Sequence, residues 1–356
     1  IIVYAVAFTT TFAIFWIIFQ RPTENPAVGE LQPMYLAAPL MLAALACGLL
    51  GIINHSLLRR VSIRLLWRHQ SQFSGIYVAK HYGYFQQLGL HVEVKPADPM
   101  ATNSALDHFG GCQFAIVSST DVVKARAKGI KMRALQVIVP EPAIAFMARE
   151  ESEIRTFADF KGRSVSYRKG YEEADVLKIM LHTVGLSLSD IVSVTGSTDC
   201  EEFIAGETEI VAGHEAIEPL ALAHQQIFVQ RIAPVLGEHP IFADTLVTTE
   251  QVIRVGPPLV RAMSAAVQLG WAAVAENPGR GIEATLYEQR DYSSSNRAFQ
   301  AEIQDAMLGL RGGARMQPVN LLPFGSREGD WLPIIQAMEA AGLVPPGLRA
   351  SEMYWL

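Results

Sequence analysis

A histidine and two glutamates stand close together in the segment GHEAIEPLAL, directly after the apolar run EIVA. His214 and Glu218 are four residues apart, so on a helix they would share one face. Imidazole and carboxylate groups at that spacing can ligate a metal ion. Since no third ligand is spaced to complete such a site, we predict no metal and no other cofactor.

Two further segments carry polar groups directly after apolar runs. Ser118 and Ser119 end the run FAIV, where their hydroxyls could donate to a ligand or cap the helix that follows. Further along, YRKGYEE follows SVSY: Gly170 permits a tight turn, and the next helix N-terminus could hold an anion. Glu172 and Glu173 in its first turn would complement the helix dipole and repel a phosphate or sulfonate.

These residues are positioned by a regular alternation of strands and helices, which begins at Ser62. The expected strands cover 62–68, 90–97, 112–119, 131–139 and 143–150, and the expected helices cover 74–89, 101–111 and 121–129. Such a βαβα order predicts an α/β fold with a parallel or mixed sheet that has helices on both faces.

Composition excludes several classes of function. The chain has 356 residues and a formal net charge of −6, with no basic stripe, so nucleic acid is not an expected partner. Its three cysteines, Cys47, Cys112 and Cys200, form no CxxC pair, which predicts neither a disulfide framework nor a zinc site.

Two uncharged apolar runs lie near the N-terminus, at residues 1–19 and 34–53. Each is close to the roughly 20 residues that a helix needs to cross a bilayer, so we predict a transmembrane helical hairpin over 1–55. The alternative for the first run is a signal peptide. Arg59, Arg60, Arg64 and Arg68 follow the second run, which favours a cytoplasmic location for the large domain.

The remainder, from Ser62 to Leu356, resembles a family of periplasmic binding proteins that includes receptors for thiamine-pyrimidine precursors and for alkanesulfonates. The likeness is carried by IYVAKHYGYFQQLGLHVEV, FAIVSSTDVVKARAKGIKMRAL, FADFKGRSVSYRKG, LKIMLHTVGLSLSDIVSV, AGHEAIEPLAL, RAMSAAVQLGWAAVAENP and the C-terminal WLPIIQAMEAAGLVPPGLRASEMYWL. The eukaryotic pyrimidine-precursor synthase of thiamine biosynthesis is a relative. The hairpin lies outside the resemblance.

The resemblance implies a two-lobed periplasmic-binding-protein (type II-like) fold, here preceded by two transmembrane helices. The expected divisions are 1–55 for the hairpin, 62–146 with 246–310 for lobe one, 147–245 for lobe two and 311–356 for a C-terminal helical appendage. The chain would cross between the lobes near Met147 and Ala243.

Ligands of such folds bind outside the C-terminal ends of the strands. The candidate ligand-binding residues are therefore Trp67, Ser74, Ser118, Ser119, Tyr167, His214 and Glu218. We expect four of them, Trp67, Ser118, Tyr167 and Glu218, to line one cavity between the lobes.

Two of these candidates take specific roles from the resemblance. Trp67 stands where the family often has a tryptophan that stacks on a flat ring; burial between the lobes is the alternative. Glu218 stands where pyrimidine receptors place a carboxylate that accepts from an exocyclic amine. Phe73 replaces a histidine that is common in pyrimidine-binding relatives, which argues for a different or more apolar ligand.

Three functions remain open. The first is a membrane-anchored binding protein for a small, pyrimidine-like ligand, without catalysis. The second is a non-catalytic accessory or scaffold subunit that meets membrane-protein partners through its hairpin. The third, the synthase, is disfavoured because Ser118 and Val122 stand where its lysine and histidine fall, and the segment around Thr245 has no cysteine.

We therefore predict that the protein is not an enzyme. Its expected location is a membrane, the bacterial inner membrane or an equivalent, with the lipid bilayer as a partner. The arginines that follow the second apolar run favour the cytoplasmic side for the large domain, whereas the family resemblance favours the periplasm.

Overall fold

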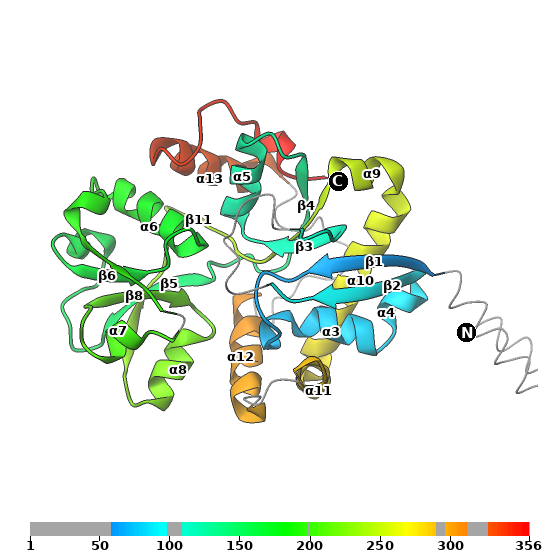
Figure 1. Cartoon of the computed structure of the whole chain (residues 1–356), viewed down its shortest axis with the longest axis horizontal. Helices are drawn as coiled ribbons and strands as arrows, with labels where there is room; N and C mark the ends of the chain where they lie inside the picture. Colours follow the sequence, from blue (N-terminus) through cyan, green and yellow to red (C-terminus); the bar gives the residue numbers. More distant parts are fainter. Residues whose placement is uncertain (1–57, 98–108, 198, 290–295, 312–326, 356) are drawn as a thin grey trace, which may run out of the picture. The chain divides into compact units, whose positions relative to one another are not determined.

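The computed structural model describes residues 58–97, 109–197, 199–289, 296–311 and 327–355, and residues Arg60–Leu356 form one compact unit (Figure 1). The predicted hairpin at 1–55 and most of the predicted helix at 101–111 lie outside the described residues. Within those ranges, no helix is both long enough and apolar enough to cross a membrane.

The first sheet has five strands in the order β2-β1-β3-β12-β4. They are β1 (Arg59–Arg64), β2 (Leu90–Lys95), β3 (Phe114–Val117), β4 (Met132–Val137) and β12 (Thr245–Thr249). β1 and β3 are parallel, whereas β12 is antiparallel to both β3 and β4. The prediction of a mixed sheet is thus confirmed.

Both faces of this sheet are covered by helices, as Figure 1 shows. Phe114 and Ile116 of β3 pack in one core cluster with α3 (Ser74–His81) and α10 (Pro257–Glu276). Ala115 and Val117, which alternate with them, pack in a second cluster with α5 (Ser119–Ala127). Because side chains alternate between the faces of a strand, a strand covered on both faces is apolar throughout, as FAIV is.

The second sheet has the strand order β7-β6-β8-β5-β9. Its strands are β5 (Ile144–Arg149), β6 (Ser164–Tyr167), β7 (Val192–Thr195), β8 (Ile210–His214) and β9 (Val229–Ile232). In Figure 1, α6 (Glu172–Thr183) lies on one face, and α7 (Glu201–Ile204) and α8 (Glu218–His224) lie on the other. Together the sheets form a two-lobed α/β fold.

Two predicted elements differ from the observed ones. The strand expected over 62–68 is β1, which ends at Arg64 and leaves Trp67 in the loop that follows. The helix expected over 74–89 is divided into α3 and α4 (Tyr84–Gln87), because Gly83 between them adopts a left-handed φ of 80°. Glycine enters that region without the steric cost of a Cβ.

The chain passes between the sheets twice, and the two crossing segments are hydrogen-bonded to each other. The amide of Ile138 donates to the carbonyl of Asp244 at 2.7 Å, and the amide of Ala243 donates to the carbonyl of Val139 at 3.0 Å. Ala243 thus lies in a crossing segment, whereas Met147 lies inside β5, paired with Val211 and Arg231.

The C-terminal helix α13 (Glu328–Ala340) joins the cores of the two sheets. Trp331 and Ile334 belong to one continuous cluster that includes Val117 of the first sheet and Phe146 of the second. Trp331 also packs edge-to-face on Phe242 of a crossing segment, with ring centroids 4.8 Å apart. One side of the two-lobed unit therefore shares a single apolar core.

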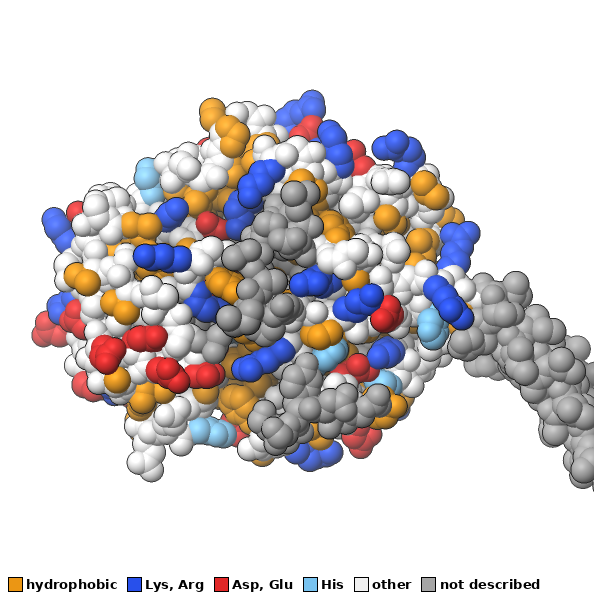
Figure 2. Space-filling view, in the orientation of Figure 1, with side chains coloured by type: hydrophobic (Ala, Val, Ile, Leu, Met, Phe, Trp, Pro, Cys, Tyr) orange, Lys and Arg blue, Asp and Glu red, His pale blue; other side chains and the backbone are white. Residues whose placement is uncertain are grey.

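The remaining elements complete the surface. They are α9 (Glu250–Val255), α11 (Pro278–Glu288), α12 (Arg297–Leu310), the two-residue strands β10 (Val235–Leu236) and β11 (His239–Pro240), and short 3-10 turns at Ser71–Phe73, Phe157–Phe160, Leu188–Asp190 and Ala350–Glu352. Figure 2 shows acidic side chains gathered over the second sheet, whereas Lys and Arg side chains are spread over this face.

Candidate functional site

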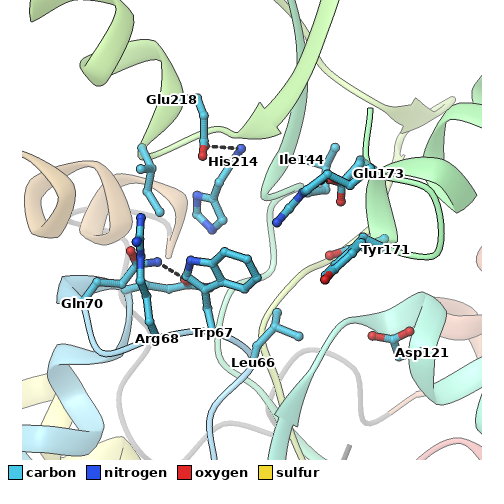
Figure 3. A pocket seen from close by; sticks show the side chains of 14 residues that line it. Leu66, Trp67, Arg68, Gln70, Asp121, Ile144, Tyr171, Glu173, His214 and Glu218 are labelled. Carbon is cyan, nitrogen blue, oxygen red and sulfur yellow. Dashed lines mark hydrogen bonds and ion pairs between the residues drawn. The ribbon is translucent and has the colours of Figure 1, made fainter. Parts of the chain in front are cut away.

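A pocket lies where loops from the two sheets meet (Figure 3). The loop after β1 lines it from the first sheet, and the loops after β6 and β8 line it from the second. The lining residues are Leu66, Trp67, Arg68, Gln70, Gln72, Asp121, Ile144, Arg168, Tyr171, Glu172, Glu173, His214, Ile217 and Glu218. The C-terminal ends of strands thus build the site, as expected for an open α/β sheet.

The cavity is small. Its volume is about 90 Å³, below the roughly 300–1,000 Å³ of typical small-molecule pockets. Figure 3 shows Trp67 between His214 and Leu66, with Tyr171 across the cavity. Side chains of the protein itself therefore occupy much of the space between the loops.

His214, the last residue of β8, presents a hydrogen-bond donor. Its Nδ1 accepts from the amide of Ala216 at 3.1 Å, so Nδ1 carries no proton. Burial, and then the charge of Arg168, lower the pKa of His214 to about 4, so the ring is neutral and its proton is on Nε2. That Nε2 is buried and has no hydrogen-bond partner among the described residues.

Glu218, the first residue of α8, presents an acceptor beside this donor. One carboxylate oxygen accepts from the amide of His214 at 2.5 Å, and burial raises the pKa of Glu218 to about 7. Gly213 permits this approach, because a Cβ there would lie 2.8 Å from Cγ of Glu218. A carboxylate has about four lone-pair sites, so Glu218 can still accept from a ligand.

Further acidic groups line the pocket at the N-termini of α5 and α6. Lys124 bridges Asp121 of α5 and Asp175 of α6, at 2.9 and 2.5 Å. Burial acts to lower the pKa of Lys124, but the two carboxylates outweigh it and the net shift is upward. Burial, and then the charges of Asp121 and Glu173, raise the pKa of Glu172 well above its usual value.

One guanidinium occupies the aromatic part of the pocket. The Arg168 guanidinium carbon lies 4.9 Å from the ring centroid of Trp67 and 4.6 Å from that of Tyr171. Its Nε donates to the buried carboxylate of Glu173 at 2.5 Å. Trp67 and Tyr171 meet edge to face at 6.5 Å between centroids, so this cluster links the two sheets.

A buried polar pair lies beside the pocket, at a crossing segment. Gln72 lines the pocket and donates to both carboxylate oxygens of Asp244, each at 3.0 Å. Burial raises the pKa of Asp244 to about 7. The described residues contain no group of three or more His, Cys, Asp or Glu side chains arranged to hold a metal ion.

The structure brings three of the seven predicted site residues together: Trp67, His214 and Glu218 all line the pocket. Of the four expected in one cavity, only Trp67 and Glu218 are there. Ser118 caps α5 by accepting from the amide of Asp121 at 3.2 Å. Tyr167 packs in the core under α6 and donates to Ser193 at 3.2 Å.

The other two serines also use their hydroxyls inside the protein. Ser74 donates to the carbonyl of Ser71 at 2.9 Å, and Ser119 donates to the carbonyl of Phe242 at 2.5 Å. Phe73, which replaces the family histidine, is fully buried against Tyr77 and does not line the pocket.

Sequence reasoning missed Arg168 and Tyr171. Both flank the predicted turn at Gly170, which drew attention only as an anion site. The available signal was an arginine and a tyrosine in the short connection between a strand and a helix. The contact with Trp67 joins segments far apart in the sequence, and no local pattern predicts it.

A two-lobed α/β fold is also what comparison with known proteins finds. The profile of the NMT1/THI5 like family matches residues 70–280, more than half of the chain. The chain belongs to the NMT1/THI5-like family. The resemblance to thiamine-pyrimidine and alkanesulfonate receptors noted from the sequence is consistent with this membership.

Individual NMT1/THI5-like relatives are distant. A Haemophilus influenzae protein named for thiamine biosynthesis is 28% identical over 173 residues, 47% of this chain and 54% of that relative. This match therefore spans about half the length of that relative. The formylaminopyrimidine-binding protein of Halalkalibacterium halodurans is 23% identical over 309 residues, 83% of this chain and 90% of that protein.

Among solved structures, the periplasmic aliphatic sulphonate binding protein SsuA from Escherichia coli matches with a TM-score of 0.64. It is 15% identical, and the match covers 83% of this chain and 92% of SsuA. At that identity the match establishes the fold, a two-lobed periplasmic-binding-protein architecture.

Proposed function

We propose that this protein binds a planar, amine-bearing small molecule in the pocket between its two sheets and does not transform it. The observation that carries the proposal is the pairing of an unpartnered donor, Nε2 of His214, with an acceptor, Glu218, beside Trp67. An aminopyrimidine edge offers a ring nitrogen that accepts and an amine that donates. Its flat face suits stacking on Trp67.

Support also comes from the relatives. A relative that matches 83% of this chain is named as a formylaminopyrimidine-binding protein, and a pyrimidine ring is planar. Four carboxyl side chains, Asp121, Glu172, Glu173 and Glu218, line the pocket, against two guanidinium groups, Arg68 and Arg168. Arg168 is already paired with Glu173. The excess of acidic groups favours an amine-bearing ligand over a sulfonate, which like charges repel.

Binding without catalysis is supported by the residues at two positions. By resemblance, the synthase carries its lysine where Ser118 stands and its histidine where Val122 stands. Ser118 caps α5, and Val122 is fully buried in the core. We expect no pyrimidine product when the purified protein is supplied with pyridoxal phosphate and histidine; product formation would overturn this part of the proposal.

The proposal includes a membrane tether and the lobe divisions expected from the sequence. The tether is supported by the two uncharged apolar runs at 1–19 and 34–53. Lobe one at 62–146 with 246–310, lobe two at 147–245 and the appendage at 311–356 are supported by the two sheets. If the tether exists, alkaline carbonate leaves the full chain in the membrane pellet; its release without detergent would contradict it.

The binding test uses isothermal titration of the full chain with two probes, an aminopyrimidine and an alkanesulfonate. We expect the aminopyrimidine to bind and the sulfonate not to. His214→Phe keeps the ring and removes the donor, so the aminopyrimidine should bind about tenfold more weakly. Tighter binding of the sulfonate, or no effect of the substitution, would overturn the ligand assignment.

One observation favours the second candidate, an accessory or scaffold subunit. The cavity of about 90 Å³ is already occupied in part by Arg168 and Tyr171, and α13 joins the two cores. A recruited fold that no longer binds a ligand would show both features. Failure of every planar probe to bind, together with co-purification of a membrane-protein complex, would establish this candidate instead.

A further inference from the structure

The Arg168 guanidinium lies where the proposed ligand would stack. It lies over Trp67 and Tyr171 and is paired with Glu173. A guanidinium is a flat, delocalised cation rich in N–H donors. Within the protein, Arg168 therefore makes the contacts that a planar cationic ligand would make: aromatic faces on one side and a carboxylate at its edge.

The segment that carries Arg168 is a short connection that is partly exposed to solvent. Residues 168–171 connect β6 to α6, and Lys169 and Gly170 are exposed. Gly170 has a left-handed φ of 88°, and a Cβ there would meet nothing within 4 Å. The Arg168 side chain is itself 25% exposed, whereas Glu173 is 2% exposed. Arg168 can swing into solvent while Glu173 stays in the pocket.

We propose that Arg168 occupies the place of the ligand when no ligand is bound, and that a planar cation displaces it from Trp67 and Glu173. We call this the stand-in role of Arg168. The proposal deepens the function proposed above and rests on it. It narrows the ligand class from planar amines to planar molecules that carry a positive charge and keep one acceptor for His214, such as an aminopyrimidine that is protonated on one ring nitrogen and accepts through the other.

The charge of Glu173 is what selects a cation. When Arg168 leaves, the buried carboxylate of Glu173 loses its partner, and an unpaired buried charge is strongly unfavourable. A neutral planar ligand would cover Trp67 but leave Glu173 uncompensated. A planar cation replaces both contacts, so exchange with Arg168 costs least for that class. Arg168 thereby acts as a specificity-determining residue.

The first test needs no ligand and measures how acrylamide quenches the fluorescence of Trp67. The chain has five tryptophans. Trp16→Phe and Trp355→Phe remove two of them, and Trp271 and Trp331 are fully buried, so the quenching that remains reports on Trp67. We expect Arg168→Ala to raise the quenching constant at least about twofold, since cation–π contact covers the ring.

Arg163→Ala is the matched control, because Arg163 pairs with Glu209 on the surface of the same sheet. It should leave quenching unchanged. An unchanged quenching constant in Arg168→Ala, or an equal rise in Arg163→Ala, would overturn the stand-in role.

The second test restores the missing group from solution. Millimolar methylguanidinium should return quenching in Arg168→Ala toward the wild-type value, whereas methylammonium, which is cationic but not planar, should not. Equal effects of the two cations would refute selection for planarity. Glu173→Gln in the Arg168→Ala background should abolish the rescue, and rescue that persists would refute the role of the carboxylate.

The third test asks whether the stand-in role of Arg168 affects ligand binding. A protonated aminopyrimidine should bind Arg168→Ala about tenfold more tightly than wild type, because no internal group competes. Weaker binding would mean that Arg168 holds the ligand, which overturns the proposal. If quenching and rescue behave as expected but no aminopyrimidine binds either protein, the stand-in contact holds and the proposed function fails.

Discussion

Glu218→Gln tests the acceptor of the proposed site, and its effect should depend on pH. Glutamine keeps the shape and an oxygen that can accept from the amide of His214, so the fold should survive. What is lost is charge. A hydrogen bond to a charged group contributes about 1.5–3 kcal/mol and a neutral one about 0.5–1.5 kcal/mol. The difference of about 1.4 kcal/mol predicts roughly tenfold weaker binding of an aminopyrimidine.

The raised pKa of Glu218 sets where this difference appears. With a pKa of about 7 in the free protein, the carboxylate is mostly ionised near pH 8 and mostly protonated near pH 6. When only the ionised form binds well, apparent affinity scales with its fraction, which falls about tenfold between these values. Wild type should therefore outbind Glu218→Gln about tenfold near pH 8 and about equally near pH 6.

Isothermal titration of both proteins with one aminopyrimidine at the two pH values provides the measurement. Titration of the ligand itself affects both proteins equally, so the ratio of dissociation constants isolates Glu218. Glu215→Gln is the control, because Glu215 lies three residues earlier, pairs with Arg231 and does not line the pocket. A ratio that is the same at both pH values, or a ratio of one near pH 8, would refute the reasoning.

Three other outcomes follow from the same contacts. Trp67→Ala should weaken aminopyrimidine binding about tenfold in a titration, and Trp67→Phe less, because aromatic stacking contributes about 0.5–1.5 kcal/mol beyond area burial; equal loss in both would argue against stacking. Lys124→Met should lower the free energy of unfolding in urea by about 3 kcal/mol, since it removes the cation that bridges the carboxylates of Asp121 and Asp175, whereas Lys128→Met on the exposed surface should not. Stability should fall as pH rises from about 4.5 to 7, because the folded pKa values of Glu218 and Asp244 are raised to about 7 and that of Glu172 is also raised, so these three carboxyl groups hold more protons in the folded state in that window. The lowered pKa values of His214 and His69 act in the opposite direction, but they are two groups against three. A melting temperature that rises across the window would contradict these shifts.

The order of strands and helices could be predicted because several buried strands are apolar runs and several helices are followed by a glycine, such as Gly89, Gly129 and Gly185. FAIV is β3, and the segments EIVA and SVSY lie in β8 and β6. Since loops after strands face the cleft in this class of fold, Trp67, His214 and Glu218 could be expected near the ends of strands, and all three line the pocket. Their role in binding remains a prediction.

Side-chain direction and competing hydrogen bonds account for the residues that lie elsewhere. Tyr167 shares its face of β6 with Val165, and both point into the core under α6. The alternation of Val165 and Tyr167 with Ser164 and Ser166 carries that information. Ser118 stands at a strand end but also at a helix N-cap, and a hydroxyl satisfies either demand. Sequence alone does not decide between them.

The shared core explains why a local exchange is a better entry route than wide opening of the lobes. Separating the sheets on the side of α13 would expose Trp331, Ile334 and their partners, which are fully buried. Each such side chain contributes about 1.5–3 kcal/mol through burial. Moving residues 168–171 breaks mainly the contacts of Arg168 and Tyr171 with Trp67 and Glu173, together with the hydrogen bond from the amide of Ala174 to the carbonyl of Tyr171. If a planar cation binds as proposed, it replaces those contacts, so its entry through this loop should cost less than opening the lobes.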